Sequence, residues 1–272
     1  MIGLAKNLFW YRELIAVMAW KRVVLRYKQS YLGLAWAILK PLTLMLVFTV
    51  LNSFIGITSG DIPYQVISYT ALVPWIFFQE SLSDGVSSIV ENAQLIRKIY
   101  FPREIFPLTG VITKLVEFVI NFLVLACLML YFKVAPAPTI VWLPVLVIYI
   151  ILASLAVALT GAALNVFYRD VSTMLPILLQ LLMYASPVIY PMSLVKQKLM
   201  VDQIAGSWSE FIYRFYTFNP LAGIIDAFQR AILYGKGPDI DVMWPGMLLT
   251  ALLLPLSYAT FKRAERYFAD IV

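Results

Sequence analysis

The sequence predicts an all-α membrane protein that forms a single domain over residues 1–272. Hydrophobic residues make up 62% of the chain and charged residues only 13%, whereas a soluble domain has about 45–50% apolar and about 25% charged residues. The apolar residues also gather into long runs, and about 20 such residues cross the hydrocarbon core of a bilayer as a helix. So few charges cannot cover a water-exposed surface of this size, which excludes a soluble fold.

Six apolar runs are long enough to span a membrane, and we expect each to be a transmembrane helix. Pro41 lies near the start of the first run and Pro74 lies inside the second, and both are tolerated because neighbouring helices can satisfy the freed backbone groups. The six runs are residues 34–56, 64–90, 105–132, 140–167, 171–190 and 242–261.

Residues 1–31 have the pattern of an amphipathic helix. Apolar residues recur there at three- to four-residue steps, and Trp10 and Trp20 are natural anchors at a membrane interface. The pattern predicts a helix that lies in the membrane surface, and the alternative is an ordinary packing helix. The segment lacks an apolar region followed by a small-residue cleavage site, so we expect no cleavable signal. The stripe is Leu4, Leu8, Tyr11, Ile15, Met18 and Leu25.

Basic residues are concentrated on one side of this topology. Thirteen of them lie in the segments that would share a side with the N-terminus, against six on the other side. By the positive-inside rule, both termini are expected to be cytoplasmic. The thirteen are Lys6, Arg12, Lys21, Arg22, Arg26, Lys28, Arg97, Lys98, Arg103, Arg169, Lys262, Arg263 and Arg266, and the six are Lys133, Lys196, Lys198, Arg214, Arg230 and Lys236.

The 91–107 loop between the second and third runs is a polar segment in a chain that otherwise avoids charge. It carries Arg97, Lys98 and Arg103, and Pro102 and Pro107 interrupt it. The chain contains no G-x-x-x-x-G-K-[ST] motif, which would cradle the phosphates of ATP. We therefore expect this loop to lie at the cytoplasmic face and to receive mechanical work from a separate ATP-hydrolysing protein.

Residues 191–241 form the longest segment between apolar runs. Within it, residues 221–234 have a helical apolar pattern that is too short to span a membrane. A re-entrant or interfacial helix covering the outer mouth of a pathway and a helix packed on the outer surface both fit this pattern.

Lys40 lies near the start of the first run, where its ammonium group can extend to the membrane interface. Four other ionisable residues fall inside the predicted spans, where each costs about 2.5–3.5 kcal/mol at mid-bilayer. Glu80 and Asp84 are four residues apart in the second run, and Lys114 and Glu117 are three apart in the third. Such spacings place each pair on one helix face. The four could line an ion or substrate pathway, but pairing within the bundle near the cytoplasmic side is the interpretation that we favour.

Histidine is absent, which removes His-based general bases and metal ligands. Two further sets of residues, an acidic pair and a group of aromatic residues, invite a functional interpretation. Asp239 and Asp241 form a D-x-D pair of the kind that holds a metal in some glycosyltransferases, so a membrane glycosyltransferase is an alternative. Aromatic residues could line a channel for sugar rings or could simply pack, and the candidates are Trp36, Phe48, Phe54, Tyr184 and Tyr190.

Six stretches in order along the chain resemble the permease subunits of ABC-2 type polysaccharide exporters, which move O-antigen, capsule and teichoic acid chains. Each stretch is short, but together they are distributed over most of the chain, from residue 27 to residue 221. They are YKQSYLGLAW at 27–36, PWIFF at 74–78, NAQLIRKIYFPRE at 92–104, LNVFYRDV at 164–171, SPVIY at 186–190 and NPL at 219–221.

The resemblance implies a homodimer of six-span subunits in a bacterial inner membrane, each joined to an ABC ATPase that binds ATP and Mg, with no cofactor in this chain. It implies that residues 1–31 are the interface helix, 91–107 the coupling helix and 191–241 the outer gate. A lipid-linked polymer would pass along the first and fifth spans. An ABC-2 permease for a drug or small lipid is the alternative. The implied coupling residues are Gln94, Leu95, Ile96, Arg97, Lys98, Tyr100, Phe101, Arg103 and Glu104.

Overall fold

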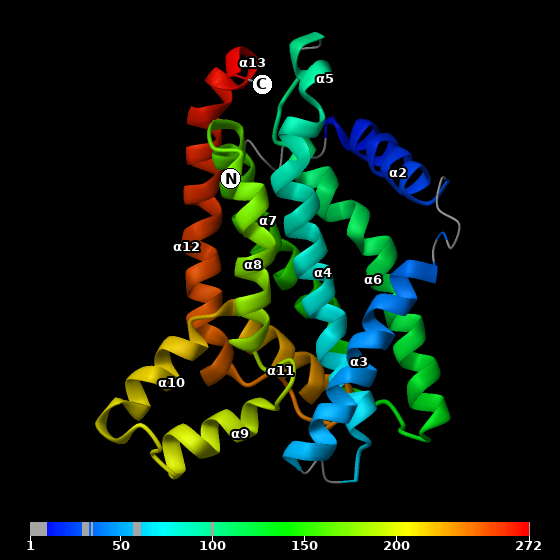
Figure 1. Ribbon diagram of the computed structural model, residues 1–272, viewed down its shortest axis with the longest axis vertical. Helices are drawn as coiled ribbons and strands as arrows, with labels where there is room; N and C mark the ends of the chain where they lie inside the picture. The colour runs from blue at the N-terminus through cyan, green and yellow to red at the C-terminus, as the bar shows by residue number, and fades with distance from the viewer. Residues whose placement is uncertain (1–9, 29–32, 34, 57–60, 99–100, 272) are drawn as a thin grey trace.

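The computed structural model describes residues 10–28, 33, 35–56, 61–98 and 101–271, and in these ranges the chain is helical without strands (Figure 1). The all-α prediction is confirmed. The α-helices are α2 (Arg12–Lys28), α3 (Ala35–Ile55), α4 (Tyr64–Glu91), α5 (Ala93–Lys98), α6 (Ile105–Tyr131), α7 (Leu143–Phe167), α8 (Asp170–Tyr184), α9 (Met192–Lys196), α10 (Ser209–Thr217), α11 (Pro220–Ile232), α12 (Ile240–Ala264) and α13 (Phe268–Ile271). The short turns are η1 (Pro138–Trp142), η2 (Gln197–Val201), η3 (Gly206–Trp208) and η4 (Glu265–Tyr267).

The long helices follow the predicted apolar runs closely. By length and composition, four helical segments among the described residues are suited to cross a membrane, namely Ala35–Ile55, Ile105–Tyr131, Pro138–Phe167 and Ile240–Tyr267. The second predicted span corresponds to α4, which is long but carries several charges, and the fifth corresponds to α8, which has only 15 residues. The count of six spans therefore remains a prediction.

Helix α8 ends earlier than the apolar run predicts. The run extends to residue 190, but the helix stops at Tyr184. Ser186 precedes Pro187, and a residue before proline is disfavoured in the helical region. The Ser186 hydroxyl donates to the Leu182 carbonyl (2.7 Å) and accepts from the Asn219 amide (2.8 Å), so the chain turns here toward the start of α11.

Helix α4 lies at the centre of the bundle, and most of its side chains are buried between α6, α7, α11 and α3. Glycines permit the closest approaches. A methyl group added at Gly110 on α6 would lie 3.0 Å from the backbone of Gly85 on α4, and one added at Gly161 on α7 would lie 2.5 Å from Val86. The α4–α6 contact is thus made by backbone against backbone, which fixes the relative position of the two helices.

The two ends of the molecule differ (Figure 1). Helices α2, α5 and α13 lie at one end, which we call the α5 end, and α9, α10 and α11 lie at the opposite end. Helix α2 packs against α6, but residues 1–9 and 29–31 of the predicted N-terminal helix lie outside the described ranges. Ile15 is buried and Tyr11, Met18 and Arg22 are partly buried, so this part of the predicted stripe faces the bundle, whereas Leu25 is 56% exposed.

The expected helix at residues 221–234 is present as α11. Asn219 caps it by accepting a hydrogen bond from the Leu221 amide (3.1 Å), and Pro220 occupies the first turn, where no amide partner is needed. Nearly all of its side chains are buried against α4, α7 and α12. The helix is therefore enclosed by the bundle and is not laid on its surface.

Candidate functional site

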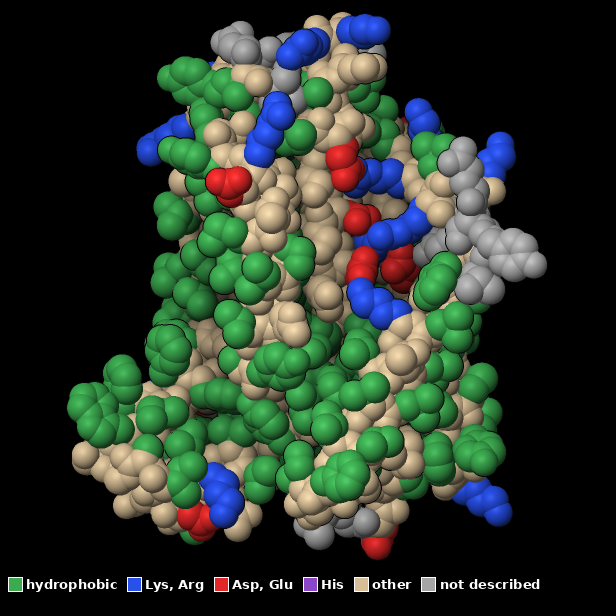
Figure 2. All heavy atoms as spheres, in the orientation of Figure 1, with side chains coloured by type: hydrophobic (Ala, Val, Ile, Leu, Met, Phe, Trp, Pro, Cys, Tyr) green, Lys and Arg blue, Asp and Glu red, His purple; other side chains and the backbone are tan. Residues whose placement is uncertain are grey.

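The most concentrated polar feature is a set of ion pairs where α2, α3, α4 and α6 meet. On the face shown in Figure 2, acidic and basic side chains gather in the upper part, whereas hydrophobic side chains cover most of the lower part. We call this feature the ion-pair cluster, and it consists of Arg26, Lys40, Glu80, Asp84, Lys114 and Glu117. The three positive charges of its basic side chains equal the three negative charges of its carboxylates in number.

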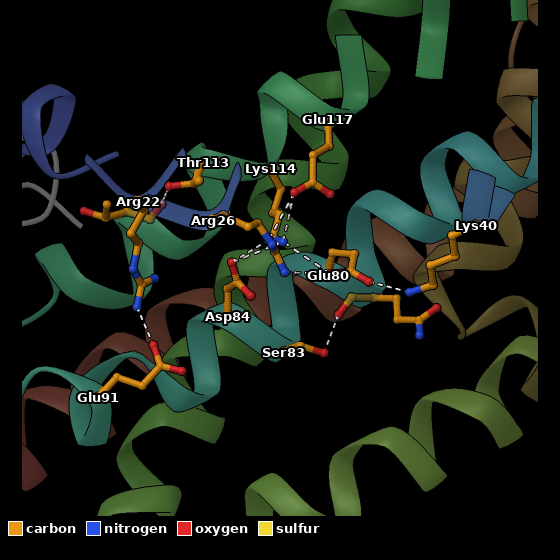
Figure 3. A network of polar contacts seen from close by, with 12 residues as sticks. Arg22, Arg26, Lys40, Glu80, Ser83, Asp84, Glu91, Thr113, Lys114 and Glu117 are labelled. Carbon is orange, nitrogen blue, oxygen red and sulfur yellow. Dashed lines mark hydrogen bonds and ion pairs between the residues drawn. The ribbon is translucent and has the colours of Figure 1, made fainter. Parts of the chain in front are cut away.

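Lys114 occupies the middle of the cluster (Figure 3). Its side chain is 0% exposed, and its ammonium group lies 3.2 Å from Glu80, 3.2 Å from Asp84 and 3.3 Å from Glu117. The predicted pair between Lys114 and Glu117 is thereby confirmed. A buried ammonium ion is tolerated only when it is paired and hydrogen-bonded, which explains why three carboxylates converge on this one cation.

Arg26 brings α2 to the same carboxylates. Its guanidinium group lies 3.0 Å from Glu117, 3.3 Å from Asp84 and 3.5 Å from Glu80. One turn earlier on α2, Arg22 donates to Glu91 at the end of α4 (2.8 Å; Figure 3). Two arginines thus fasten the N-terminal helix to α4 and α6.

Lys40 on α3 completes the cluster by pairing with Glu80. The sequence suggested only that this lysine could extend its ammonium group toward the membrane interface. Its partner is 40 residues away, so local spacing gives no signal for the contact. A cavity of about 280 Å³ opens beside the cluster, with Arg26, Trp36, Lys40 and Glu117 among its lining residues.

Arg22 and Arg26 were not singled out by the sequence, although a signal for them existed. Arg22 interrupts the apolar stripe of residues 1–31, and Arg26 follows it by four residues. Because residues four apart share a helix face, the basic pair lies on the side that faces the bundle. The charge within the apolar stripe therefore marked an ion pair with the bundle, in which the partner Glu91 is itself 56% exposed.

The 91–107 loop divides into two parts with different surroundings. Helix α5 lies at one extreme of the molecule, where Ile96 is buried and anchors it while Gln94, Arg97 and Lys98 are exposed and Leu95 is half-buried. Tyr100 lies outside the described residues. This short helix thus presents a basic, exposed face.

The second part of the loop is fastened to the C-terminal end of α12. Lys262 donates to the buried carboxylate of Glu104 (2.6 Å) and to Glu265 (2.7 Å). The Arg103 backbone amide donates to the Glu265 carboxylate (3.1 Å), and its guanidinium group donates to the Glu265 carbonyl oxygen. Phe101 is half-buried, and its ring packs against that of Phe106 with the two ring centroids 5.2 Å apart.

Sequence reasoning missed Lys262 and Glu265. The Lys262–Glu104 contact joins residues 158 positions apart, so no local pattern signals it. Arg103 and Glu104 were grouped with Arg97 and Lys98 as coupling residues, but their side chains are directed to the C-terminal turn. Only Arg97 and Lys98 combine basic charge with exposure in this loop.

The five aromatic candidates have different environments. Phe54 is 82% exposed, and Trp36 and Tyr184 are also exposed, whereas Phe48 is only 4% exposed and packs in the core. The Tyr190 hydroxyl donates to the Tyr184 carbonyl oxygen (2.8 Å). Three of the five therefore offer open surface on this chain.

The D-x-D pair has a structural role. Asp239 caps α12 by accepting from the Asp241 amide (3.2 Å), and its other oxygen lies 3.2 Å from Arg230. No group of three or more His, Cys, Asp or Glu side chains within the described ranges is arranged to hold a metal ion. The local contacts of Asp239 are thus those of a helix cap.

Comparison with known proteins gives a consistent result over the length of the chain. The profile of the family described as ABC-2 type transporter matches residues 13–233. The chain is 28% identical over 273 residues to the O-antigen export system permease protein RfbA of Myxococcus xanthus, covering 100% of both proteins. It is 27% identical over 276 residues to the Klebsiella pneumoniae protein of the same name, covering 100% of this chain and 99% of the relative. The polysialic acid transport protein KpsM of Escherichia coli is 24% identical over 251 residues, with 88% of this chain and 90% of the relative covered.

Proposed function

Because this chain belongs to the ABC-2 type transporter family, we propose that it is the permease subunit of an ATP-driven exporter that moves a lipid-linked polysaccharide out of the cytoplasm. The observation that carries the proposal is similarity over the full length to permeases named for O-antigen export. A polysialic acid transport protein is a further relative. The substrate class is therefore a polymer of the O-antigen, capsule or teichoic acid type, and the chain itself is a transporter subunit and no enzyme.

We place α3, α4, α6, α7, α8 and α12 across the inner membrane as six spans, with both termini in the cytoplasm. Helix α4 would otherwise be costly to insert because it carries Glu80 and Asp84. The ion-pair cluster offsets that cost, since Lys114, Arg26 and Lys40 neutralise these carboxylates. Trp10, just before α2, and Trp20, on α2, are exposed and suit the cytoplasmic headgroup layer.

We assign the driving step to a separate ABC ATPase, present in two copies, that binds ATP and Mg and contacts α5. Exposed Arg97 and Lys98 give this short helix the charge to meet an acidic surface. ATP binding would draw together the α5 helices of two copies of this chain in a homodimer. The 91–107 loop is thus the coupling element, and residues 1–31, which include α2, are the interface helix.

The polymer path runs between the two subunits along α3 and α8. Exposed Trp36, Phe54 and Tyr184 supply flat apolar faces there, which suit the faces of sugar rings. Phe48 supports this path by packing in the core, and Tyr190 supports it by donating a hydrogen bond to the backbone carbonyl of Tyr184. The 191–241 segment, with α9, α10 and α11, forms the outer gate at the far end of the path.

Reversal of charge on α5 tests the coupling role. The variant Arg97→Glu, Lys98→Glu should lose capture of the partner ATPase and polymer-stimulated ATP hydrolysis in reconstituted vesicles, because like charges would face each other. The matched control reverses Lys133 and Lys236, which are exposed at the opposite end of the molecule. Normal ATPase binding and export by the α5 variant would show that the coupling assignment is wrong.

Deletion of the chain tests the substrate class. Cells that lack it should accumulate completed, lipid-linked polymer on the cytoplasmic side while polymer synthesis continues. Loss of synthesis would instead indicate a glycosyltransferase, and the Asp239→Ala, Asp241→Ala variant would then reproduce that loss. Unchanged polymer together with increased sensitivity to a drug, or an altered lipid composition, would indicate a permease for a small substrate.

A further inference from the structure

Helix α12 is joined to functional elements at both of its ends. At the α5 end, Lys262 on its last turn pairs with Glu104, whose carboxylate is buried and also accepts from the Tyr258 hydroxyl (3.5 Å). Glu265 follows directly and binds both the amide and the guanidinium group of Arg103. Two consecutive residues of the 91–107 loop are therefore held by the C-terminal turn of α12.

At the opposite end, α12 is joined to α11. Arg230 on α11 lies 3.2 Å from Asp239, the residue that caps α12, and also donates to the Gly237 carbonyl oxygen (3.1 Å). A methyl group added at Gly223 of α11 would lie 3.0 Å from the Met243 Cα atom, and one added at Gly246 of α12 would lie 2.7 Å from the Pro220 Cα atom. The two helices thus touch through their backbones, which leaves little freedom for one to move without the other.

Between these two joints α12 is one uninterrupted helix, although Pro245 and Pro255 lie within it and each lacks the amide of a backbone hydrogen bond. Its 25 residues correspond to a length of about 38 Å at about 1.5 Å per residue. It packs along α7, and a hydrogen bond joins Thr160 to Ser257 (2.8 Å). A displacement of the C-terminal turn is therefore expected to reach the α11 joint, because a packed helix moves largely as a rigid element.

Resting on the proposed function, we propose that Lys262 and Glu265 are positioning residues that pass the movement of the 91–107 loop into α12 and so to α11. Helix α6 offers a second route from the loop to α11. It begins immediately after Glu104, and its Phe118 ring packs against Phe228 of α11 with the ring centroids 6.3 Å apart. That route depends on chain continuity and ring packing. Breaking the Lys262–Glu104 pair leaves it intact, so the contribution of α12 can be separated.

The experiment follows the outer region while the ATPase works. In a Cys127→Ser background, Phe215→Cys places a reporter on α10, where the side chain is exposed. The complex with its partner ATPase is reconstituted, and the rate of labelling by a membrane-impermeant thiol reagent is measured with and without ATP. Polymer export and ATP hydrolysis are measured in the same vesicles.

The variant Lys262→Glu should still bind the ATPase and hydrolyse ATP, but the ATP-dependent change in labelling and the export rate should fall by about 5-fold or more. The charge swap Glu104→Lys, Lys262→Glu should recover most of both. The control Arg263→Glu makes the same charge change at the neighbouring exposed position and should behave as the unmodified protein.

Full coupling in Lys262→Glu, or a well-folded charge swap without recovery, would overturn the proposal. If Lys262→Glu does not fold, the pair Glu104→Gln, Lys262→Met removes the contact without leaving a buried charge, and it should uncouple in the same way. Failure of the unmodified complex to bind an ATPase would contradict the proposed function instead, so the two results are distinguishable.

Discussion

Lys114 on α6 and Glu80 on α4 form an ion pair 3.2 Å long in which the lysine side chain is wholly buried. Asp84 and Glu117 lie at nearly the same distance from the ammonium group. A single buried charge would be very costly, whereas a set in which each charge is paired is tolerated. The packing of α4 on α6 therefore depends on this pair as well as on the Gly85–Gly110 contact.

Replacement of Lys114 by methionine tests the electrostatic part of that packing. Lys114→Met leaves Glu80, Asp84 and Glu117 with less compensating charge, so stability should fall by about 3–5 kcal/mol. Thermal unfolding of the purified protein in detergent measures the change. Lys198→Met, which removes an exposed pair with Asp202, should cost no more than about 1 kcal/mol; equal losses in the two variants would contradict the prediction.

The attachment of α2 through Arg26 predicts a local effect. Arg26→Gln removes the contacts to Glu80, Asp84 and Glu117, so α2 should separate more often from α6. Hydrogen–deuterium exchange should therefore be faster in residues 12–28 while α7 and α12 are unchanged. Lys21→Gln, an exposed residue of the same helix, is the control, and equal exchange in both variants would show that Arg26 does not hold the helix.

The backbone contact between α4 and α6 predicts that adding a single methyl group at Gly110 destabilises the fold. Gly110→Ala should destabilise the protein by about 1–3 kcal/mol because the neighbouring atoms are Gly85 backbone and cannot turn aside. Gly237→Ala is the control, since its added methyl group would lie 3.8 Å from the nearest atom outside its neighbours, on Trp142. The melting temperatures of the two variants in detergent decide the point.

The buried acid on α11 predicts a pH dependence at the outer end. Burial raises the pKa of Asp226 to about 6 from an ordinary value of 3.8, although Arg230 opposes the shift and Asp239 adds to it. The folded state therefore binds this proton more tightly than the unfolded state, and stability contributed by the protonated form is lost as pH rises from about 4 to about 6.

Asp226→Asn should consequently raise the melting temperature above pH 6, corresponding to a gain of about 3 kcal/mol at most, and should have no such effect near pH 4. Melting curves between pH 4 and pH 8 measure the difference. Asp202→Asn removes the carboxylate of a more exposed pair with Lys198 and serves as the control. A gain that is independent of pH would show that packing, and not ionisation, is responsible.

The sequence by itself determined the helical class, the approximate limits of the long helices and the positions of the polar breaks. These follow from composition and from the number of apolar residues in a row, which are local properties. The Lys114–Glu117 pair was also predictable, because three residues is a fixed distance on a helix. The helix α11 followed from the apolar spacing of residues 221–234.

Only the tertiary structure decided which charges share a site. Arg26, Lys40 and Glu80 come from three helices, and Glu104 meets Lys262 across 158 positions of the chain. The hydrogen bond from Asn219 to Ser186, which ties the chain after α8 to the start of α11, likewise joins residues 33 positions apart. Ion pairing acts through space, so the partner of a charge is set by how helices pack, and no periodicity within one helix contains that information.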